Sequence, residues 1–369
     1  MKKIIRSAAD KGSKRFESGQ LSEVDQKLVK LLEGLKTSIR VVGVGGAGCN
    51  TISRLSEMNV EGAETSTMNT DAQDLLYASS DRKVLLGAEL TGGLGAGADP
   101  SVGANAAKES LNEISAAVQG ADLAFVTCGL GGGTGSGAAP VIAEIAKDAG
   151  ALTIAVVTLP FTVEGMVRWQ NAAESLAKLK KVVDTVVVIP NDKLLQIVPD
   201  LPLNSAFKVS DELLANSIKG VTEMITKPGL INLDFADLRT ALSNAGTAVI
   251  GIGESTSETF SENRAVEALE EALGSPLLDL DIGTANRALV NVIGGPDMTL
   301  QEAQAAVDYL HGRIHPDANI IWGCQIEEGT GNNSVRIMVV LSGVRVSDFF
   351  SNSPIGGLKG KFDIDVDYI

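Results

Sequence analysis

The stretch Gly129-Leu130-Gly131-Gly132-Gly133-Thr134-Gly135-Ser136-Gly137 lies between an apolar run, residues 123–127, and a helical segment that extends to residue 149. Five of the seven residues from Gly131 to Gly137 lack a side chain, so backbone N–H groups can surround an anion closely. The N-terminus of the following helix adds partial positive charge, and Thr134 and Ser136 add hydroxyl donors. The stretch therefore predicts a phosphate site at a strand–helix junction.

Two other glycine-rich stretches precede predicted helices. In Gly43-Val44-Gly45-Gly46-Ala47-Gly48 the glycines match the G-x-G-x-x-G pattern of dinucleotide-binding folds, and Asp71 follows at a distance that suits a ribose contact. The other stretch, residues 91–100, ends with Asp99 as a predicted N-cap and Pro100 in the first helical turn. One such loop suits a dinucleotide, whereas three at strand–helix junctions of one sheet favour a triphosphate. No G-x-x-x-x-G-K-[ST] pattern occurs, which excludes a P-loop NTPase.

The composition of the 369-residue chain is that of a globular protein with about two domains. Its net charge of −15 argues against a dedicated nucleic-acid binder, and no apolar run is long enough to span a membrane. The three cysteines, Cys49, Cys128 and Cys324, are far apart. Their number and spacing fit a reducing cytoplasm and give neither a disulfide framework nor a zinc site.

The pattern of apolar segments predicts two units joined by a long helix. Between residues 39 and 189, apolar strands alternate with helices, including one from Pro100 to near Gly120, which indicates a parallel sheet covered on both faces. A long helix is expected over residues 210–226, because Lys227-Pro228-Gly229 is a strong stop. The second unit is expected to contain helices near 234–243, 262–273 and 300–312 and strands at 248–252, 289–293, 319–326 and 335–341. The last two strands are expected to be antiparallel.

Taken in order along the chain, these and further motifs resemble the tubulin/FtsZ superfamily and, within it, the FtsZ family. Gly131–Gly137 resembles the signature phosphate loop of the superfamily. The match runs from about residue 38 to 345, and a separate N-terminal helix at 22–36 with a short tail resembles archaeal members. The other segments that carry the resemblance are Gly45-Gly46-Ala47-Gly48-Cys49-Asn50, Asn69-Thr70-Asp71-Ala72-Gln73, Leu94-Gly95-Ala96-Gly97, Pro160-Phe161 with Glu164 and Arg168, Pro190-Asn191-Asp192, Phe207 with Asp211, and Asn232-Leu233-Asp234-Phe235-Ala236-Asp237.

The resemblance implies an α/β fold. An N-terminal Rossmann-like GTPase domain with a parallel sheet would be followed by a long central helix and a smaller C-terminal α+β domain with a mixed sheet. The expected boundaries are 1–37 for an N-terminal extension with a helix, 38–209 for the GTP-binding domain, 210–228 for the central helix, 229–346 for a GTPase-activating domain and 347–369 for the tail.

The resemblance also implies a set of nucleotide-binding residues. Asp211 would accept hydrogen bonds from guanine N1–H and the 2-amino group, Asn191 would contact the base, and Phe207 would stack on it. Glu164 and Arg168 would contact the ribose and approach the phosphates. Taken alone, Asp211 could equally be a solvated surface charge, Phe207 a core aromatic residue, and the other two a surface ion pair four apart on a helix. The remaining implied contacts are Gly45, Gly46, Ala47, Gly48, Asn50, Asn69, Asp71, Ala96, Gly97, Gly131, Gly132, Gly133, Thr134, Gly135, Ser136 and Pro160.

Asp234 and Asp237 lie three residues apart at the start of a predicted helix, where acidic side chains act as caps. The resemblance implies a second role, because in FtsZ-like proteins the nucleotide face of one subunit abuts this segment of the next. Such head-to-tail contacts build filaments when they do not close a ring. The two carboxylates would orient a water for attack on the γ-phosphate of GTP, and Asn232 would position their loop. Mg²⁺ would be bound mainly through the phosphates, with no protein side chain assigned to it.

The implied function is that of a self-assembling GTPase that converts GTP to GDP, is activated by polymerisation and forms the cytoplasmic cell-division ring at mid-cell. Its partners would be further copies of itself and proteins that anchor it to the membrane or regulate division. Residues 363–369, where acidic and hydrophobic side chains alternate, and the basic residues 2–15 are candidate contacts for an anchor or anionic lipid. Two alternatives stay open: a tubulin-like cytoskeletal protein that determines cell shape, and an NAD-dependent oxidoreductase based on Gly43–Gly48 alone.

Overall fold

A computed structural model describes residues 37–197, 202–227, 229–255, 263–278, 282–327 and 334–344 of the chain. The helix expected at residues 22–36 and the tail at residues 347–369 lie outside the described residues. Within the described ranges, no helix combines the length and the apolar character needed to cross a membrane.

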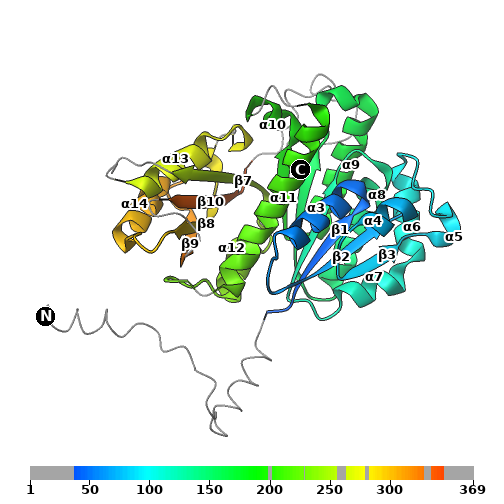
Figure 1. The fold of residues 1–369 in the computed structure, drawn as a ribbon, viewed down its shortest axis with the longest axis horizontal. Coiled ribbons are helices and arrows are strands. Elements are labelled where there is room, and N and C mark those ends of the chain that lie inside the picture. Colours follow the sequence, from blue (N-terminus) through cyan, green and yellow to red (C-terminus); the bar gives the residue numbers. More distant parts are fainter. Residues whose placement is uncertain are drawn as a thin grey trace, which may run out of the picture. The chain divides into compact units, whose positions relative to one another are not determined.

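The described strands form one ten-stranded sheet in the order β3-β2-β1-β4-β5-β6-β7-β10-β8-β9 (Figure 1). In-register parallel pairing places the last residues of β1 and β4 side by side, with Val44 opposite Cys128. We call the side on which the parallel strands end the carboxyl edge, and the side on which they begin the amino edge. The parallel part is the one that the sequence predicts, and it consists of β1 (Ile39–Val44), β2 (Ala63–Asn69), β3 (Arg82–Leu85), β4 (Leu123–Gly129), β5 (Leu152–Leu159) and β6 (Thr185–Pro190).

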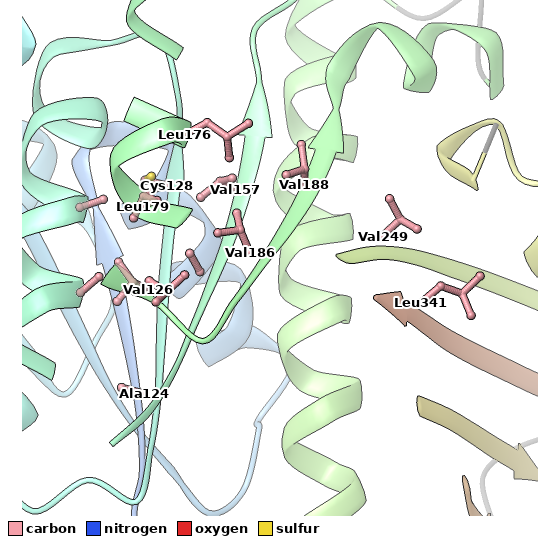
Figure 2. Packing of buried hydrophobic residues seen from close by; sticks show 14 of the residues in the cluster. Ala124, Val126, Cys128, Val157, Leu176, Leu179, Val186, Val188, Val249 and Leu341 are labelled. Carbon is pink, nitrogen blue, oxygen red and sulfur yellow. The ribbon is translucent and has the colours of Figure 1, made fainter. Parts of the chain in front are cut away.

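Helices cover both faces of the parallel part, and alternate strand residues point into two cores. Val41 and Phe125 belong to the core under α3 and α11, whereas Val42 and Val126 belong to the core on the opposite face, under α8 and α9. Figure 2 shows the second core, which continues to Leu341 in the C-terminal half. The helices of the N-terminal half are α3 (Gly45–Glu57), α4 (Ala72–Tyr77), α5 (Ala88–Thr91), α6 (Pro100–Glu109), α7 (Leu111–Val118), α8 (Gly133–Asp148), the 3₁₀ turn η1 (Thr162–Glu164), α9 (Met166–Val182), α10 (Asn191–Ile197) and α11 (Leu203–Thr226).

The C-terminal half extends the same sheet with strands of mixed direction. β7 is parallel to β6, and β10 is antiparallel to both β7 and β8. This mixed sheet agrees with the α+β arrangement that the sequence predicts. Its elements are α12 (Phe235–Leu242), β7 (Gly246–Ser255), α13 (Arg264–Gly274), η2 (Pro276–Leu278), η3 (Ile282–Thr284), β8 (Arg287–Gly294), α14 (Leu300–His311), β9 (Asn319–Ile326) and β10 (Val335–Ser342).

Three expectations about the elements need correction. The long helix begins at Leu203 rather than at residue 210, because Pro202 stands at its N-cap, where its missing N–H is no loss. The helix expected from Pro100 to residue 120 breaks at Ser110, whose hydroxyl accepts a hydrogen bond from Gly87 N. β9 and β10 run in opposite directions as expected, but they do not pair, because β8 lies between them.

Helix α11 runs from the carboxyl edge to the amino edge. Its last residue, Thr226, packs against Gly62, which directly precedes β2: a Cβ on Gly62 would lie 2.7 Å from Thr226 Cγ2. Figure 1 shows α10 near one end of α11 and α12 near the other. On α12, Arg239 Nη2 donates to the carbonyl of Gly150, which precedes β5. The chain from Thr226 to Arg239 is therefore fixed at the amino edge at both of its ends.

Candidate functional site

A cavity of about 240 Å³ lies at the carboxyl edge. The first turns of α3 and α8, the segments after β5 and β6, and the N-terminal part of α11 enclose it. Five lining residues were not predicted as contacts: Val44, Gly129, Leu130, Thr158 and Ser210. The first three lie inside the glycine-rich stretches, whereas Thr158 on β5 and Ser210 on α11 lie outside every quoted motif. The predicted residues that line the cavity are Gly45, Gly46, Ala47, Gly132, Gly133, Thr134, Gly135, Pro160, Glu164, Arg168, Asn191, Phe207 and Asp211.

The glycines of the loop between β4 and α8 serve two purposes. A Cβ on Gly133 would lie 2.8 Å from Asp99 N, and a Cβ on Gly137 would lie 2.0 Å from the carbonyl oxygen of Pro100. The protein's own packing therefore requires these two glycines. A Cβ on Gly132 would meet no atom within 4 Å, although Gly132 lines the cavity. Gly132 is thus the position at which a side chain would fill open space without a clash.

The glycines of the first loop explain why it resembles a dinucleotide motif. A Cβ on Gly43 would lie 2.2 Å from Gly48 O, and one on Gly48 would lie 2.6 Å from Thr127 O. Both residues allow α3 to pack closely against β1 and β4. Gly45, with a φ of 71°, is in the left-handed region that favours glycine and begins α3 at the cavity.

The two hydroxyls predicted to donate to phosphate have different surroundings. Thr134 lines the cavity, and its Oγ1 lies 2.6 Å from Thr70 Oγ1. Ser136 is buried, and its Oγ accepts a hydrogen bond of 2.7 Å from Gly131 N. Ser136 therefore stabilises the shape of the loop, and it does not line the cavity.

The third glycine-rich stretch lies between α5 and α6, so the expectation that it follows a strand is wrong. The four residues of α5 are too few to give a periodic signal in the sequence. The stretch contacts the loop at the start of α8, since a Cβ on Gly133 would lie 2.9 Å from Ala96 Cβ. Asn171 on α9 links the two loops as well: its Nδ2 donates to Ala98 O at 3.2 Å and to Gly131 O at 3.3 Å.

An aromatic and an amide side chain border the cavity near α11. Phe207 packs edge-to-face on Phe161, with ring centroids 5.0 Å apart and an interplanar angle of 90°. Phe207 is 39% exposed and lines the cavity, so it is not a core aromatic residue. Asn191 is buried, and its Oδ1 accepts a hydrogen bond of 2.8 Å from Ser210 Oγ. These groups form a flat, partly polar wall that suits an aromatic base.

Asp211 is the acidic group of this wall. Burial raises the pKa of Asp211 to about 7, and a hydrogen bond with Asn50 lowers it in part. Asp211 is therefore not a solvated surface charge. A ligand that donates hydrogen bonds to this carboxyl would favour its ionised form.

Glu164 and Arg168 form an ion pair at the cavity, with 2.6 Å between Oε2 and Nη1. The expectation that they share a helix is wrong, because Glu164 ends η1 and Gly165, with a φ of 92°, separates it from α9. The second oxygen of Glu164 accepts from Phe161 N at 2.8 Å. The pair therefore joins the segment after β5 to the start of α9.

Several predicted residues lie outside the cavity lining. Asp71 caps α4 by accepting from Gln73 N and Asp74 N at 2.9 and 3.1 Å, and Asn69 Oδ1 accepts from Asp71 N at 3.3 Å. These contacts stabilise the turn after β2. The predicted residues that do not line the cavity are Gly48, Asn50, Asn69, Asp71, Ala96, Gly97, Gly131 and Ser136.

Asp234, Asp237 and Asn232 lie near α12, away from the cavity. Asp234 is the N-cap of α12 and accepts from Asp237 N at 2.8 Å, while Asp237 accepts from Asp234 N at 3.3 Å. This reciprocal pair is a capping box. Asn232 Oδ1 accepts from Gly229 N at 2.6 Å and stabilises the approach to the helix. All three side chains are exposed.

Cysteine and metal chemistry find little support in the described part of the chain. Burial raises the pKa of Cys49 and of Cys128 to about 12, so both remain thiols at neutral pH. Among the described residues, no group of three or more His, Cys, Asp or Glu side chains is placed to hold a metal ion.

Comparisons with known proteins agree with this architecture. Residues 38–199 match the Tubulin/FtsZ family, GTPase domain, and residues 246–345 match the FtsZ family, C-terminal domain. The fold is therefore that of the tubulin-like GTPases. The interpretation of Gly43–Gly48 as part of an NAD-dependent oxidoreductase is wrong, because Gly43 and Gly48 pack α3 and the family is a GTPase family.

Archaeal FtsZ proteins are among the similar proteins. The chain is 54% identical over 341 residues to Cell division protein FtsZ 1 of Thermococcus kodakarensis, which covers 92% of this chain and 90% of the relative. It is 52% identical over 361 residues to Cell division protein FtsZ 1 of Methanocaldococcus jannaschii, with 97% of each chain covered. The solved structure described as an empty FtsZ dimer from M. jannaschii superposes with a TM-score of 0.81 at 54% identity, over 88% of this chain and 93% of that chain. The chain belongs to the FtsZ family.

Proposed function

We propose that the protein is a GTPase that polymerises head to tail, with GTP bound in the cavity of one subunit and hydrolysed with the help of Asp234 and Asp237 of the next. The observation that carries this proposal is the position of these groups at opposite edges of one sheet. Asp211 lines the cavity, whereas the capping box follows the far end of α11. Thr226 lies 15 positions after Asp211 on this helix, which corresponds to a rise of about 22 Å. A single subunit therefore holds only half of the catalytic centre.

The wall of Asn191, Phe207 and Asp211 supports guanine as the base. An ionised carboxylate can accept from both N1–H and the 2-amino group of guanine, and adenine lacks this pair of donors. A site built to accept these donors leaves its own polar groups unpaired with adenine, which gives discrimination. Phe207 offers an exposed ring for stacking.

The glycine-rich loops support a phosphate chain next to this wall. Backbone N–H groups at the first turns of α3 and α8 meet at the cavity, and both helix N-termini carry partial positive charge. The cavity fits GTP with Mg²⁺, because oxygen atoms of phosphate and water are the ligands that Mg²⁺ prefers. Bound there through the phosphates, Mg²⁺ would neutralise negative charge on them.

The proposed roles at the amino edge follow from the exposed carboxylates. The carboxylates of Asp234 and Asp237 each accept one hydrogen bond from the backbone N–H of the other residue. Each carboxylate can therefore accept a further hydrogen bond from a water molecule in the neighbouring subunit's site. A carboxylate that accepts from this water would orient it for in-line attack on the γ-phosphate. Asn232 fixes the segment that leads to this pair through Gly229 N.

Exposed apolar side chains support contact between the two edges. Val163 and Val167 are 77% and 66% exposed, and they flank Glu164 and Arg168 at the cavity. Leu230, 61% exposed, lies four residues before Asp234 on the other edge. Large apolar side chains exposed beside a functional site are typical of an interface. A second copy of the chain would cover both sets at one head-to-tail contact.

We further propose that the polymer forms the division ring at mid-cell in the cytoplasm, with anchoring and regulatory proteins bound to it. The names of the T. kodakarensis and M. jannaschii relatives, both cell division proteins, support this role. We propose boundaries at 38–209 for the nucleotide domain, 210–228 for the central segment and 229–346 for the activating domain. The helix itself, α11, covers Leu203–Thr226.

A mixing experiment tests the split site. Asp237→Asn keeps an oxygen that can accept from Asp234 N but removes the negative charge, and Gly132→Val fills the phosphate cavity without a backbone clash. Each variant alone should hydrolyse GTP slowly. Their mixture should recover part of the activity, because one type of interface combines an intact cavity with an intact capping box.

The dependence on concentration provides the control. Wild-type turnover per subunit should rise steeply with protein concentration and vanish on dilution, while GTP binding persists. Turnover that is flat across concentration, or a mixture no more active than the sum of its parts, would show that the catalytic centre lies within one subunit. A wild-type protein that binds ATP and GTP equally would contradict the assignment of the base.

A further inference from the structure

Asn171 joins two of the glycine-rich loops, although no sequence motif includes it. Its Nδ2 donates to the carbonyl oxygens of Ala98 and Gly131 at 3.2 and 3.3 Å. Ala98 belongs to the stretch before α6, and Gly131 belongs to the loop before α8. Asn171 lies on α9, one turn after Arg168, which lines the cavity.

The backbone that Asn171 holds is in an unfavourable conformation. Ala98 has a φ of 63°, and the preceding Gly97 has a φ of 57°. Glycine adopts this left-handed region readily, but a Cβ makes it costly for alanine. A strained residue persists only where its surroundings hold it, and the amide of Asn171 does so at the Ala98 carbonyl.

The two ends of the stretch are held by other contacts. Gly95 N donates to Thr70 O at 3.1 Å, and Asp99 N donates to Ala96 O at 3.0 Å. Asp99 then caps α6 through Ser101 N. The middle of the stretch, Gly97 and Ala98, is exposed, and a Cβ on Gly97 would meet no atom within 4 Å. The Asp99 N–Ala96 O bond closes the turn around Gly97 and Ala98, and the amide of Asn171 adds a side-chain hydrogen bond to its middle.

The stretch packs against Gly133 in the first turn of α8, a part of the cavity lining that is distinct from the base wall. Phe207 and Asp211 form the base wall on α11. In the stretch, by contrast, Ala96 and Asp99 lie so close to Gly133 that a Cβ on Gly133 would clash with them. A nucleotide whose base lies on α11 and whose phosphates lie on the first turn of α8 would point its outermost phosphate toward this stretch.

We propose that Asn171 is a positioning residue for the terminal phosphate of GTP, acting by holding Ala98 in its left-handed conformation. The proposal rests on the proposed function, because it requires GTP in the cavity. It predicts that Asn171 contributes to the preference for GTP over GDP, although Asn171 does not line the cavity. A purely structural residue would affect both nucleotides alike.

The test compares the affinities of Asn171→Ala for GTP and GDP, measured by equilibrium dialysis with Mg²⁺, with those of the wild type and of Gln170→Ala, which removes the adjacent amide on α9. Loss of two neutral hydrogen bonds should weaken GTP binding about tenfold, with GDP binding within about twofold of the wild type. Equal weakening for both nucleotides, or no weakening, would overturn the proposal. Failure of the wild type to bind GTP would instead overturn the proposed function.

A second substitution tests the route through Ala98. Glycine at position 98 removes the cost of the left-handed backbone, so Ala98→Gly should restore much of the GTP affinity that Asn171→Ala loses. The same change in the wild type should alter GTP affinity by less than about twofold, because Asn171 already holds the conformation. A double variant that binds GTP no better than Asn171→Ala would overturn this route.

Discussion

The carboxyl edge and the amino edge of the parallel strands carry their polar groups in different ways. At the carboxyl edge, Asn191 and Thr134 are buried, and burial shifts the pKa of Asp211. At the amino edge, Asp234 and Asp237 are exposed and hold each other. Buried groups fixed around a cavity can bind a ligand within one subunit. Exposed carboxylates without a cavity act only on what another molecule brings to them.

The largest effect is expected at two glycines of one loop. Gly137→Val should lower the free energy of unfolding by more than about 4 kcal/mol, because a Cβ there would lie 2.0 Å from Pro100 O. Gly132→Val should leave the melting temperature unchanged but weaken GTP binding about 100-fold or more, because the side chain takes the place of the phosphates. Thermal denaturation and nucleotide titration separate the two outcomes. If Gly132→Val binds GTP normally, the cavity is not the phosphate site.

The next effect concerns the base wall. Asp211→Ala should weaken GTP binding about 100-fold, because two hydrogen bonds to a charged group are lost, and ATP binding should not change. Circular dichroism should show an intact fold. Asp211→Asn is the matched variant, since it keeps the shape but presents both a donor and an acceptor. An unchanged ratio of GTP to ATP affinity in either variant would remove Asp211 from the base site.

The raised pKa of Asp211 predicts a pH dependence of binding. Guanine donors need the ionised carboxylate, so GTP affinity should be constant above about pH 8 and fall by up to about tenfold per pH unit below pH 7. Binding near pH 7 should release a proton, detectable by calorimetry in buffers of different ionisation enthalpy. Asp211→Asn corrects for titration of the nucleotide phosphates. The dependence should be weaker in this variant, and an equal dependence would contradict the role of Asp211.

The smallest effects are expected at the amino edge. Asp237→Asn should leave the GTP dissociation constant within about twofold of the wild type, because the site of binding lies at the other edge. Asp234→Ala removes the N-cap of α12 and should cost about 1 kcal/mol of stability. Nucleotide titration and urea unfolding measure both quantities. Weak GTP binding by dilute Asp237→Asn would place this residue in the cavity of its own subunit.

The strand pattern and the glycine loops are largely visible in the sequence, because each depends on local chemistry. The β-branched runs at β1, β4, β5 and β6 predict the parallel sheet, and most predicted phosphate-loop glycines line the cavity. The motifs did not reveal why each glycine is needed. Gly132 and Gly133 look alike in sequence, but only Gly133 lies against Asp99.

Features that depend on distant parts of the chain were not predictable. β10, the last strand along the chain, inserts between β7 and β8, so the order in the sheet differs from the order along the chain, and no local pattern encodes this. Asn171 gives no signal in the sequence, because its hydrogen-bond partners are the carbonyls of Ala98 and Gly131, 73 and 40 residues away. The raised pKa of Asp211 likewise arises from burial, which depends on the whole fold and cannot be read from one segment of the sequence.

Helix α11 also sets a length for any polymer. Its 24 residues correspond to about 36 Å, and it reaches from the cavity side of the sheet to the side that carries Asp234 and Asp237. If the carboxyl edge of each copy contacts the amino edge of the next, neighbouring copies cannot be closer along the filament than the length of α11. The axial repeat seen in electron micrographs of filaments should therefore be no shorter than about 36 Å. Every subunit should also point the same way, which gives the filament two chemically different ends: one exposes an open cavity, and the other exposes a capping box.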